Sequence, residues 1–448
     1  MKKAFYLLGL LWLMMACSSR DTTTVTVVTD QTDTQSDLIL ISKDSLYREK
    51  FDTLGTVRYV LPNSFKDSYA TINYKNYTLP IFIEAGKDLE VNVALKEKYK
   101  KATFNGASAK INEYLNGDSL KSIRIFFELD EQAFITDLFN TEKNLVKQLE
   151  SMNFKESFVR QEKKRLHYML FTYLGIYPSY HARHVKENGY EPSEKLYNTL
   201  KEVIIEDDEI SNLSEYRWAW NYAIEVFGNK GLKVFNPELN TSNQLDFILQ
   251  HIKNPTTIEK NVHVVVINYI NNYGLDKADK FIKIYKERVH SPSRVTLFEK
   301  VCSKWNRLKS GQHAPDFKLT DINGKEVTLS TLAGKYVYID VWATWCNPCR
   351  KELPHMQKLE KMFKGKNIHF VSVSCDKDKK AWENMVKEKH MEGIQLHMDK
   401  GSSFGEDYVI QGIPRFILLD KEGRIIYSEM TRPSDPATIE TIRALKGI

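Results

Sequence analysis

The sequence predicts three folded parts, the last of which is an α/β domain with a mixed sheet flanked by helices over residues 311–448. A small antiparallel β-sandwich over 37–105 and an all-helical region over 106–310 precede it. Three observations support this division. The length of 448 residues exceeds what one core usually serves. The hydrophobic period changes from 2 to 3.6 after the sandwich, and alternating strands and helices return after His313.

The N-terminus predicts export. Residues 1–16 resemble a secretory signal peptide, because two lysines precede the apolar run 5–15, which is too short to cross a bilayer as a helix. "LMMAC" followed by two serines resembles a bacterial lipoprotein box, in which the chain is cut before Cys17 and lipid is attached to its sulfur. A cleaved secretory signal with an incidental cysteine is the alternative. We expect 17–36 to be a tether, although 25–28 could form an edge strand.

Short strand-like runs bounded by turn residues predict the sandwich. They are "LILIS", "TVRYVL", "SYATINY", "LPIFIEAG", "DLEVNVAL" and "ATFNG". In the following region apolar residues recur at the spacing of one helix face, as in Leu166, Met169, Leu170, Tyr173 and Leu174. Such stripes usually form a core, with a groove for a partner as the less common use.

The last domain begins with a hairpin whose turn is "DINGKE". The buried strand "YVYIDVW" follows, then a helix that opens with "CNPC". Further strands are "IHFVSVS", "GIQLHM", "RFILLD" and "RIIYSEM", with helices at "DKKAWENMVKEKH" and "SFGEDYV". This order predicts a mixed sheet with helices on its faces.

Composition and charge argue against several classes of ligand. The net charge of +6 is spread over a large chain without a basic stripe, and no glycine-rich phosphate loop occurs, so we expect no nucleic-acid partner and no nucleotide cofactor. Of five cysteines, Cys302 and Cys375 stand alone. A structural zinc site would need a second closely spaced pair or matching histidines, so we expect no metal.

Cys346 and Cys349 are the candidate reactive pair. At the start of a helix they lie on one side of the first turn, close enough to join. Free backbone N–H groups there favour a thiolate, so the pKa of Cys346 should lie below about 8.5. Pro348 suits the first turn because its missing N–H is not needed there. A zinc site and a static disulfide remain as alternatives to redox cycling.

"WCNPC" after "DVWAT", "GIP" at 412–414 and the "APDF" opening together resemble the thioredoxin superfamily, in particular the TlpA/ResA-type exported thiol:disulfide reductases. The resemblance covers 311–448. It implies that Cys346 is the exposed nucleophile and Cys349 the buried resolving thiol. It also implies that the Ile413–Pro414 bond is cis, faces the sulfurs and pairs with an extended substrate segment.

Other site residues follow from the same resemblance. Asp340 matches the family's buried acid, whose raised pKa would suit it to accept the proton of Cys349; an acid on a bulged, wetted edge is the alternative. Glu352 matches a glutamate beside the active site, with a solvated helix face as the alternative. Trp342 and Trp345 are expected to line the site, with Trp345 against the substrate; ordinary core packing is the alternative.

Arg415 departs from the family's usual threonine after the proline. A guanidinium near the sulfurs would lower the Cys346 pKa further and attract acidic substrate segments. The alternative is that the Arg415 side chain points into solvent.

These observations predict a thiol:disulfide oxidoreductase, most simply a reductase, lipid-anchored to a bacterial envelope membrane and facing the periplasm. Its partners would be a protein disulfide substrate and an electron-donating membrane thiol:disulfide protein. A peroxiredoxin-like peroxidase shares "APDF", but Thr344 before Cys346 lacks that family's proline and spacing. An adaptor lipoprotein with a redox switch is the other alternative, since about two-thirds of the chain precedes the redox domain.

Overall fold

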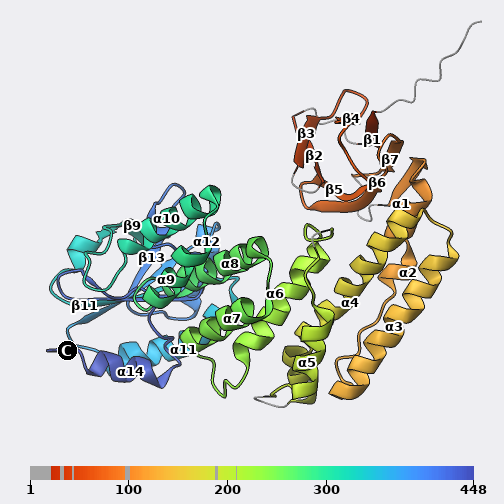
Figure 1. Cartoon of the computed structure of the whole chain (residues 1–448). Coiled ribbons are helices and arrows are strands. Elements are labelled where there is room, and N and C mark those ends of the chain that lie inside the picture. Colours follow the sequence, from red (N-terminus) through yellow and green to blue (C-terminus); the bar gives the residue numbers. More distant parts are fainter. Residues whose placement is uncertain (1–21, 31–34, 43–44, 96–100, 187–189, 208) are drawn as a thin grey trace, which may run out of the picture. The chain divides into compact units, whose positions relative to one another are not determined.

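The computed structural model describes residues 22–448 except 31–34, 43–44, 96–100, 187–189 and 208 (Figure 1). The predicted signal peptide and lipid-bearing Cys17 lie outside these residues. The chain divides into two compact units, 1–226 and 227–448, which meet within helix α6 (Ser214–Asn229).

The first unit contains the predicted sandwich of two four-stranded sheets. One has the order β4-β1-β7-β8 and the other β3-β2-β5-β6. The strands of the first sheet are β1 (Thr23–Thr29), β4 (Thr56–Leu61), β7 (Asp88–Val93) and β8 (Ala102–Gly106). Those of the second are β2 (Asp37–Ser42), β3 (Ser45–Lys50), β5 (Ser68–Tyr74) and β6 (Tyr77–Ile83). Alternate residues of both sheets meet in one core that includes Val25, Leu40 and Val91, each with no exposed surface.

Strand β1 corrects the expected tether. The structure places 23–29 in the middle of a sheet, where β1 pairs antiparallel with β4 and parallel with β7. It is therefore a central strand and not an edge strand. Its Val25 and Val27 are fully buried in the core, which fixes the strand to the sandwich. Strand β3 was not predicted, because its charged and largely exposed residues lack an apolar alternation.

Ten helices follow in the described chain. Those of the first unit are α1 (Ala109–Asn116), α2 (Asp118–Lys121), α3 (Glu131–Ser151), α4 (Glu156–Val185) and α5 (Glu194–Val203). Beyond α6, those of the second unit are α7 (Pro237–His251), α8 (Pro255–Tyr273), α9 (Asp279–Arg288) and α10 (Pro292–Asn306). The predicted apolar stripe on α4 is confirmed as core, since Leu166, Leu170 and Leu174 have no exposed surface. The helical region expected as one domain is instead divided between the two units. Within the described residues, no helix has the length and hydropathy needed to cross a membrane.

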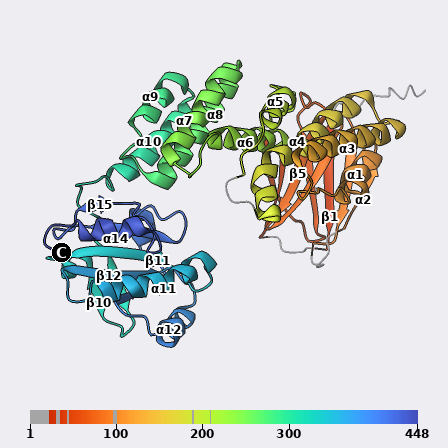
Figure 2. The ribbon, with the colours of Figure 1, turned by 90° about the horizontal axis from the view of Figure 1, so that it is seen from below.

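The C-terminal sheet has seven strands in the order β10-β9-β13-β12-β11-β14-β15. Their bounds are β9 (Lys318–Asp321), β10 (Glu326–Thr328), β11 (Tyr336–Trp342), β12 (Ile368–Ser374), β13 (Ile394–His397), β14 (Arg415–Leu419) and β15 (Ile425–Tyr427). β11 lies parallel to its neighbour β12 (both labelled in Figure 2). It lies antiparallel to β14, so the sheet is mixed as predicted. The helices are α11 (Asn347–Met362), α12 (Lys379–Glu388), α13 (Phe404–Asp407) and α14 (Pro436–Arg443), of which α14 was not predicted.

Helices α11 and α14 cover one face of this sheet. Met356 and Leu359 of α11 and Ile442 of α14 pack with Tyr338 and Phe416 in a single apolar cluster. All seven residues of β11 are buried, so this strand is covered on both faces. Any polar side chain on β11 therefore lies deep inside the domain.

In the first unit, helix α4 is joined to the sandwich by a buried polar network. The Tyr69 hydroxyl of β5 donates to Glu162 at 2.5 Å, and Arg165 donates to both Glu162 oxygens at 2.7 Å. Arg165 also pairs with Glu215 at 2.7 Å. Glu162 has no exposed surface, so its charge depends on Arg165.

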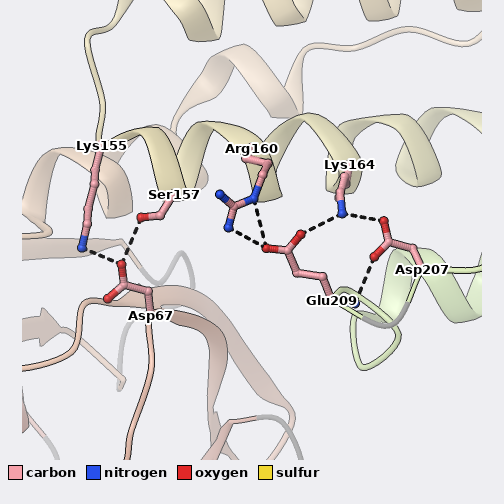
Figure 3. Close-up of polar contacts among 7 residues, drawn as sticks. All are labelled: Asp67, Lys155, Ser157, Arg160, Lys164, Asp207 and Glu209. Atoms are coloured by element: carbon pink, nitrogen blue, oxygen red, sulfur yellow. Dashed lines mark hydrogen bonds and ion pairs between the residues drawn. The ribbon is translucent and has the colours of Figure 1, made fainter.

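A second network along α4 is more exposed (Figure 3). Lys155 and Ser157 bind Asp67, while Lys164 pairs with both Asp207 and Glu209 at 2.7 Å. Exposed pairs of this kind contribute roughly 0–1 kcal/mol each, because water and salt screen them. The two networks should therefore differ strongly in their effect on stability.

Arg165→Met is expected to lower the free energy of unfolding by about 3–5 kcal/mol, because it leaves the buried Glu162 charge uncompensated. Lys164→Met, one residue away, is the matched control and should cost under about 2 kcal/mol, because it removes two exposed pairs. Urea unfolding followed by circular dichroism measures both. Equal losses would contradict the distinction between the two networks.

Candidate active site

The two cysteines lie where strand β11 passes into helix α11. β11 ends at Trp342, and after a short loop Cys346 caps the helix, its sulfur accepting the backbone N–H of Cys349 at 3.2 Å. A disulfide joins Cys346 to Cys349, with 5.3 Å between their Cα atoms. The predicted approach of the sulfurs at a helix N-terminus is therefore confirmed.

The expected exposure of Cys346 is wrong for this disulfide state. Only 4% of Cys346 and 2% of Cys349 are exposed. Both pack in one cluster with Trp342 and the half-buried Ile413, which cover the bridge. Trp345 is the exposed member of the site, with 69% of its surface accessible. Trp345 is therefore the side chain of this site that solvent reaches most, while both sulfurs are covered.

The loop before β14 faces the disulfide. The Ile413–Pro414 peptide bond is cis, as the resemblance implied. The carbonyl oxygen of Ile413 lies 3.9 Å from the Cys346 sulfur. Backbone of this loop is thus within reach of whatever is bonded to that sulfur.

Asp340 is buried in the middle of β11, with 4% of its surface exposed. Its neighbours across the sheet are Ser372 of β12 and Phe416 of β14. Burial raises the pKa of Asp340 to about 8, and repulsion from Glu352 and then Glu360 of α11 adds to this shift. The alternative of an acid on a wetted edge is wrong.

Glu352 and Glu360 lie on the buried face of α11, two turns apart. Glu352 is 7% exposed and accepts both the backbone N–H and the hydroxyl of Ser434 at 2.9 Å, so the alternative of a solvated helix face is wrong. Burial, followed by repulsion from Glu392, raises the pKa of Glu360 to about 7. Glu360 was missed by sequence reasoning, although its place in the apolar stripe of α11 beside Leu359 is a usable signal.

Arg415 lies neither at the sulfurs nor in solvent. Its guanidinium donates twice to the Ser428 carbonyl oxygen, at 2.8 and 2.6 Å, pairs with Glu429, and lies 5.3 Å from the centre of the Trp305 ring. Burial lowers the pKa of Arg415 and raises that of Glu429 to about 7, while their mutual attraction opposes both shifts. Since Glu429 balances its charge, Arg415 is better described as a support of the proline loop than as a group that activates Cys346 or binds acidic substrate.

Asp376 is a second residue that sequence reasoning missed. Its carboxylate accepts the backbone N–H of Thr344 at 2.9 Å, the Thr344 hydroxyl at 2.7 Å and the Ser374 hydroxyl at 2.8 Å. It is 3% exposed and fixes the loop that leads into Cys346. An acid two residues after a buried strand, at the edge where β11 also ends, is the signal that could have identified it.

Cys302 and Cys375 are free thiols, and both are half-buried. Burial raises the pKa of each, so neither resembles an activated thiolate.

A disulfide at the start of a helix, opposite a cis-proline loop, in a domain whose preceding strand carries a buried acid in a mixed sheet, defines a thioredoxin-fold protein of thiol–disulfide exchange. Comparison with known proteins agrees. Residues 309–444 match the Redoxin family model. The thiol-disulfide oxidoreductase ResA of Bacillus cereus is 34% identical over 29% of this chain and 75% of its own length. ResA of Bacillus subtilis strain 168 is 32% identical over 29% of this chain and 73% of its own.

Among solved structures, a protein of Bacteroides vulgatus described as a thiol-disulfide oxidoreductase is 60% identical over 30% of this chain and 89% of its own, with a TM-score of 0.28. The identity to ResA over three quarters of that relative shows the family. The chain belongs to the TlpA/ResA-type thiol-disulfide oxidoreductases of the thioredoxin superfamily.

Asp340→Asn is expected to stabilise the disulfide form, and more so as the pH rises from about 4 to 8. In that interval the folded carboxyl, with its pKa of about 8, keeps a proton that the unfolded carboxyl has released, so the stability of the unmodified protein falls. The gain should reach several kcal/mol near pH 8, stay level above it, and be small below pH 4. Thermal unfolding across this range measures it.

Asp246→Asn, at an exposed position of α7, is the control and should show no such trend. A difference between Asp340→Asn and the unmodified protein that does not change with pH would contradict the buried, protonated carboxyl.

Proposed function

We propose that this protein is a lipid-anchored, periplasm-facing thiol:disulfide reductase that works through its Cys346–Asn347–Pro348–Cys349 dithiol. Its substrates would be protein disulfides, and an electron-donating thiol:disulfide protein of the membrane would restore the dithiol. The observation that carries the proposal is the Cys346–Cys349 bridge at the N-terminus of α11, with the Ile413 carbonyl oxygen 3.9 Å from the Cys346 sulfur.

Cys346 would be the attacking thiolate. Its sulfur is the N-cap of α11 and already accepts the Cys349 N–H, an arrangement that stabilises a negative sulfur and lowers the pKa of the thiol. The thiolate attacks one sulfur of the substrate disulfide, a mixed disulfide forms, and the other substrate sulfur leaves as a thiolate. Ile413 and Pro414 would hold the backbone of the attached substrate, with Trp345 beside it.

Asp340 would accept the proton of the Cys349 thiol. Cys349 must lose its proton before it attacks Cys346 and releases the second substrate thiol. An acid with a pKa of about 8 matches a thiol of about 8.5 closely, so proton transfer between them, directly or through one water, needs little driving force. In the disulfide state the same carboxyl keeps the proton that Cys349 takes back on re-reduction. Glu352 and Glu360 would act indirectly, through their effect on the Asp340 pKa.

The central test uses insulin as a protein disulfide and dithiothreitol as reductant. The unmodified protein should accelerate insulin reduction, Cys346→Ala should abolish the acceleration, and Cys349→Ala should accumulate a mixed disulfide that mass spectrometry detects. The rate of mixed-disulfide resolution should rise with pH up to about 8, because Asp340 must be ionised to accept the proton, and Asp340→Asn should slow it and flatten this rise.

Full turnover by Cys346→Ala would reject the dithiol mechanism. The direction is tested by the reduction potential measured against glutathione. A value near the thioredoxin value of about −270 mV supports a reductase, and one near about −120 mV would instead indicate an oxidant.

The anchor rests on Cys17 and the export signal before it. Strand β1 begins at Thr23, so the connection from a lipidated Cys17 to the sandwich would span at most about 20 Å. In a bacterial host, Cys17→Ser should move the protein from the membrane fraction to the soluble periplasmic fraction. Fractionation and immunoblotting measure this, with Cys302→Ser as the control. Retention of Cys17→Ser in the membrane would reject the lipid anchor.

A further inference from the structure

A groove of about 430 Å³ lies beside the proline loop, within the second unit. Helix α10 forms one wall with Leu297, Lys300, Lys304 and Trp305, and the segment 405–411 forms the other. Asn271 of α8 also lines it. The mechanism described above does not use this groove.

The groove has a donor and an acceptor that lack partners. The indole N–H of Trp305 and the side-chain oxygen of Asn271 are both buried and make no hydrogen bond. Trp305 is 1% exposed, and the benzo edge of its ring lies where a Cβ on Gly274 would come within 3.2 Å. The N–H is on the opposite edge of the indole, away from Gly274. Unpaired buried polar groups cost free energy, so a ligand that supplies one acceptor and one donor would be favoured here.

An extended polypeptide supplies both groups, since each residue carries one C=O and one N–H. The groove also ends close to the reactive centre along the chain. Gln411 lines it, and Ile413, whose carbonyl oxygen contacts Cys346, lies two residues further on. At most about 7 Å of backbone separates them, which two residues of a bound segment would span.

The charge of the groove favours acidic side chains. Lys300 and Lys304 are exposed and lie one helical turn apart on α10, and Glu406 is the single acidic residue among those that line the groove. We propose that this groove binds an extended segment of the protein substrate next to its reacting cysteine, with acidic side chains directed at Lys300 and Lys304. The inference rests on the proposed function and names its substrate class.

The test uses synthetic peptides whose single cysteine is joined to thionitrobenzoate. One peptide alternates valine and aspartate on both sides of the cysteine, so that either chain direction reaches the groove, and the other has lysine in place of aspartate. N-acetylcysteinamide joined to thionitrobenzoate is the small reference. The Cys346 thiolate forms a mixed disulfide with the peptide and releases coloured thionitrobenzoate. Cys349 then frees the peptide thiol, so the protein dithiol is oxidised while the probe is reduced to two thiols.

The reduced full chain should react with the aspartate peptide about tenfold faster than with the lysine peptide, a difference that two partly exposed ion pairs can supply and that salt should diminish. Lys300→Glu/Lys304→Glu should reverse the preference. Lys260→Glu/Lys283→Glu makes the same charge change at exposed positions of α8 and α9 outside the groove. This control variant should still prefer the aspartate peptide. Asn271→Leu should slow both peptides about fivefold and leave the small reference unchanged.

Equal rates for the two peptides, or a preference that survives charge reversal on α10, would overturn the groove assignment while the small reference still reacts. A small reference that fails to react would overturn the proposed function itself.

Discussion

The structure of the reactive domain depends on one constraint, the burial of a carboxylic acid in a strand that is covered on both faces. β11 has neighbours on both edges and no exposed residue, so only 4% of Asp340 is accessible to water. An ionised carboxylate in such surroundings costs free energy, so burial favours the protonated form and raises the pKa of Asp340 to about 8. A less buried strand would leave an ordinary aspartate, ionised at neutral pH and a poor match for a thiol.

The carboxylates under α11 differ because their partners differ. Glu352 is fixed by two donors from Ser434, which replace much of the hydration it loses. Asp340 lies between Ser372 and Phe416 and responds mainly through its protonation state. Burial is the main cause of the raised pKa of Asp340, and repulsion from Glu352 and Glu360 of α11 adds to it. Stability therefore falls as the pH rises from about 4 to 8, because the folded carboxyl of Asp340 keeps a proton there that the unfolded carboxyl has released.

Sequence reasoning identified the features that are set locally. The strand "YVYIDVW", the helix that follows and the Cys346–Cys349 pair depend on period and spacing, and the buried position of Asp340 follows from its apolar neighbours in the strand. Sequence reasoning failed for the features that contacts between distant residues determine. β1 is central because β4 and β7 lie on either side of it, and no local signal distinguishes that from an edge. Asp376 was missed because its partner Thr344 is 32 residues away.

The predicted start of the thioredoxin-like domain at residue 311 leaves out a residue that supports its proline loop, as the contacts of Arg415 show. The loop that carries Pro414 continues into Arg415, whose guanidinium is held by Ser428, by Glu429 and by the face of Trp305. Trp305 belongs to α10 and is 1% exposed, so its ring is an integral part of the packing around this loop. Removing the helices would expose Arg415 and withdraw one wall of its site. The support of the proline loop thus comes partly from outside the thioredoxin-like fold, which gives α10 a defined structural task beside the reactive disulfide.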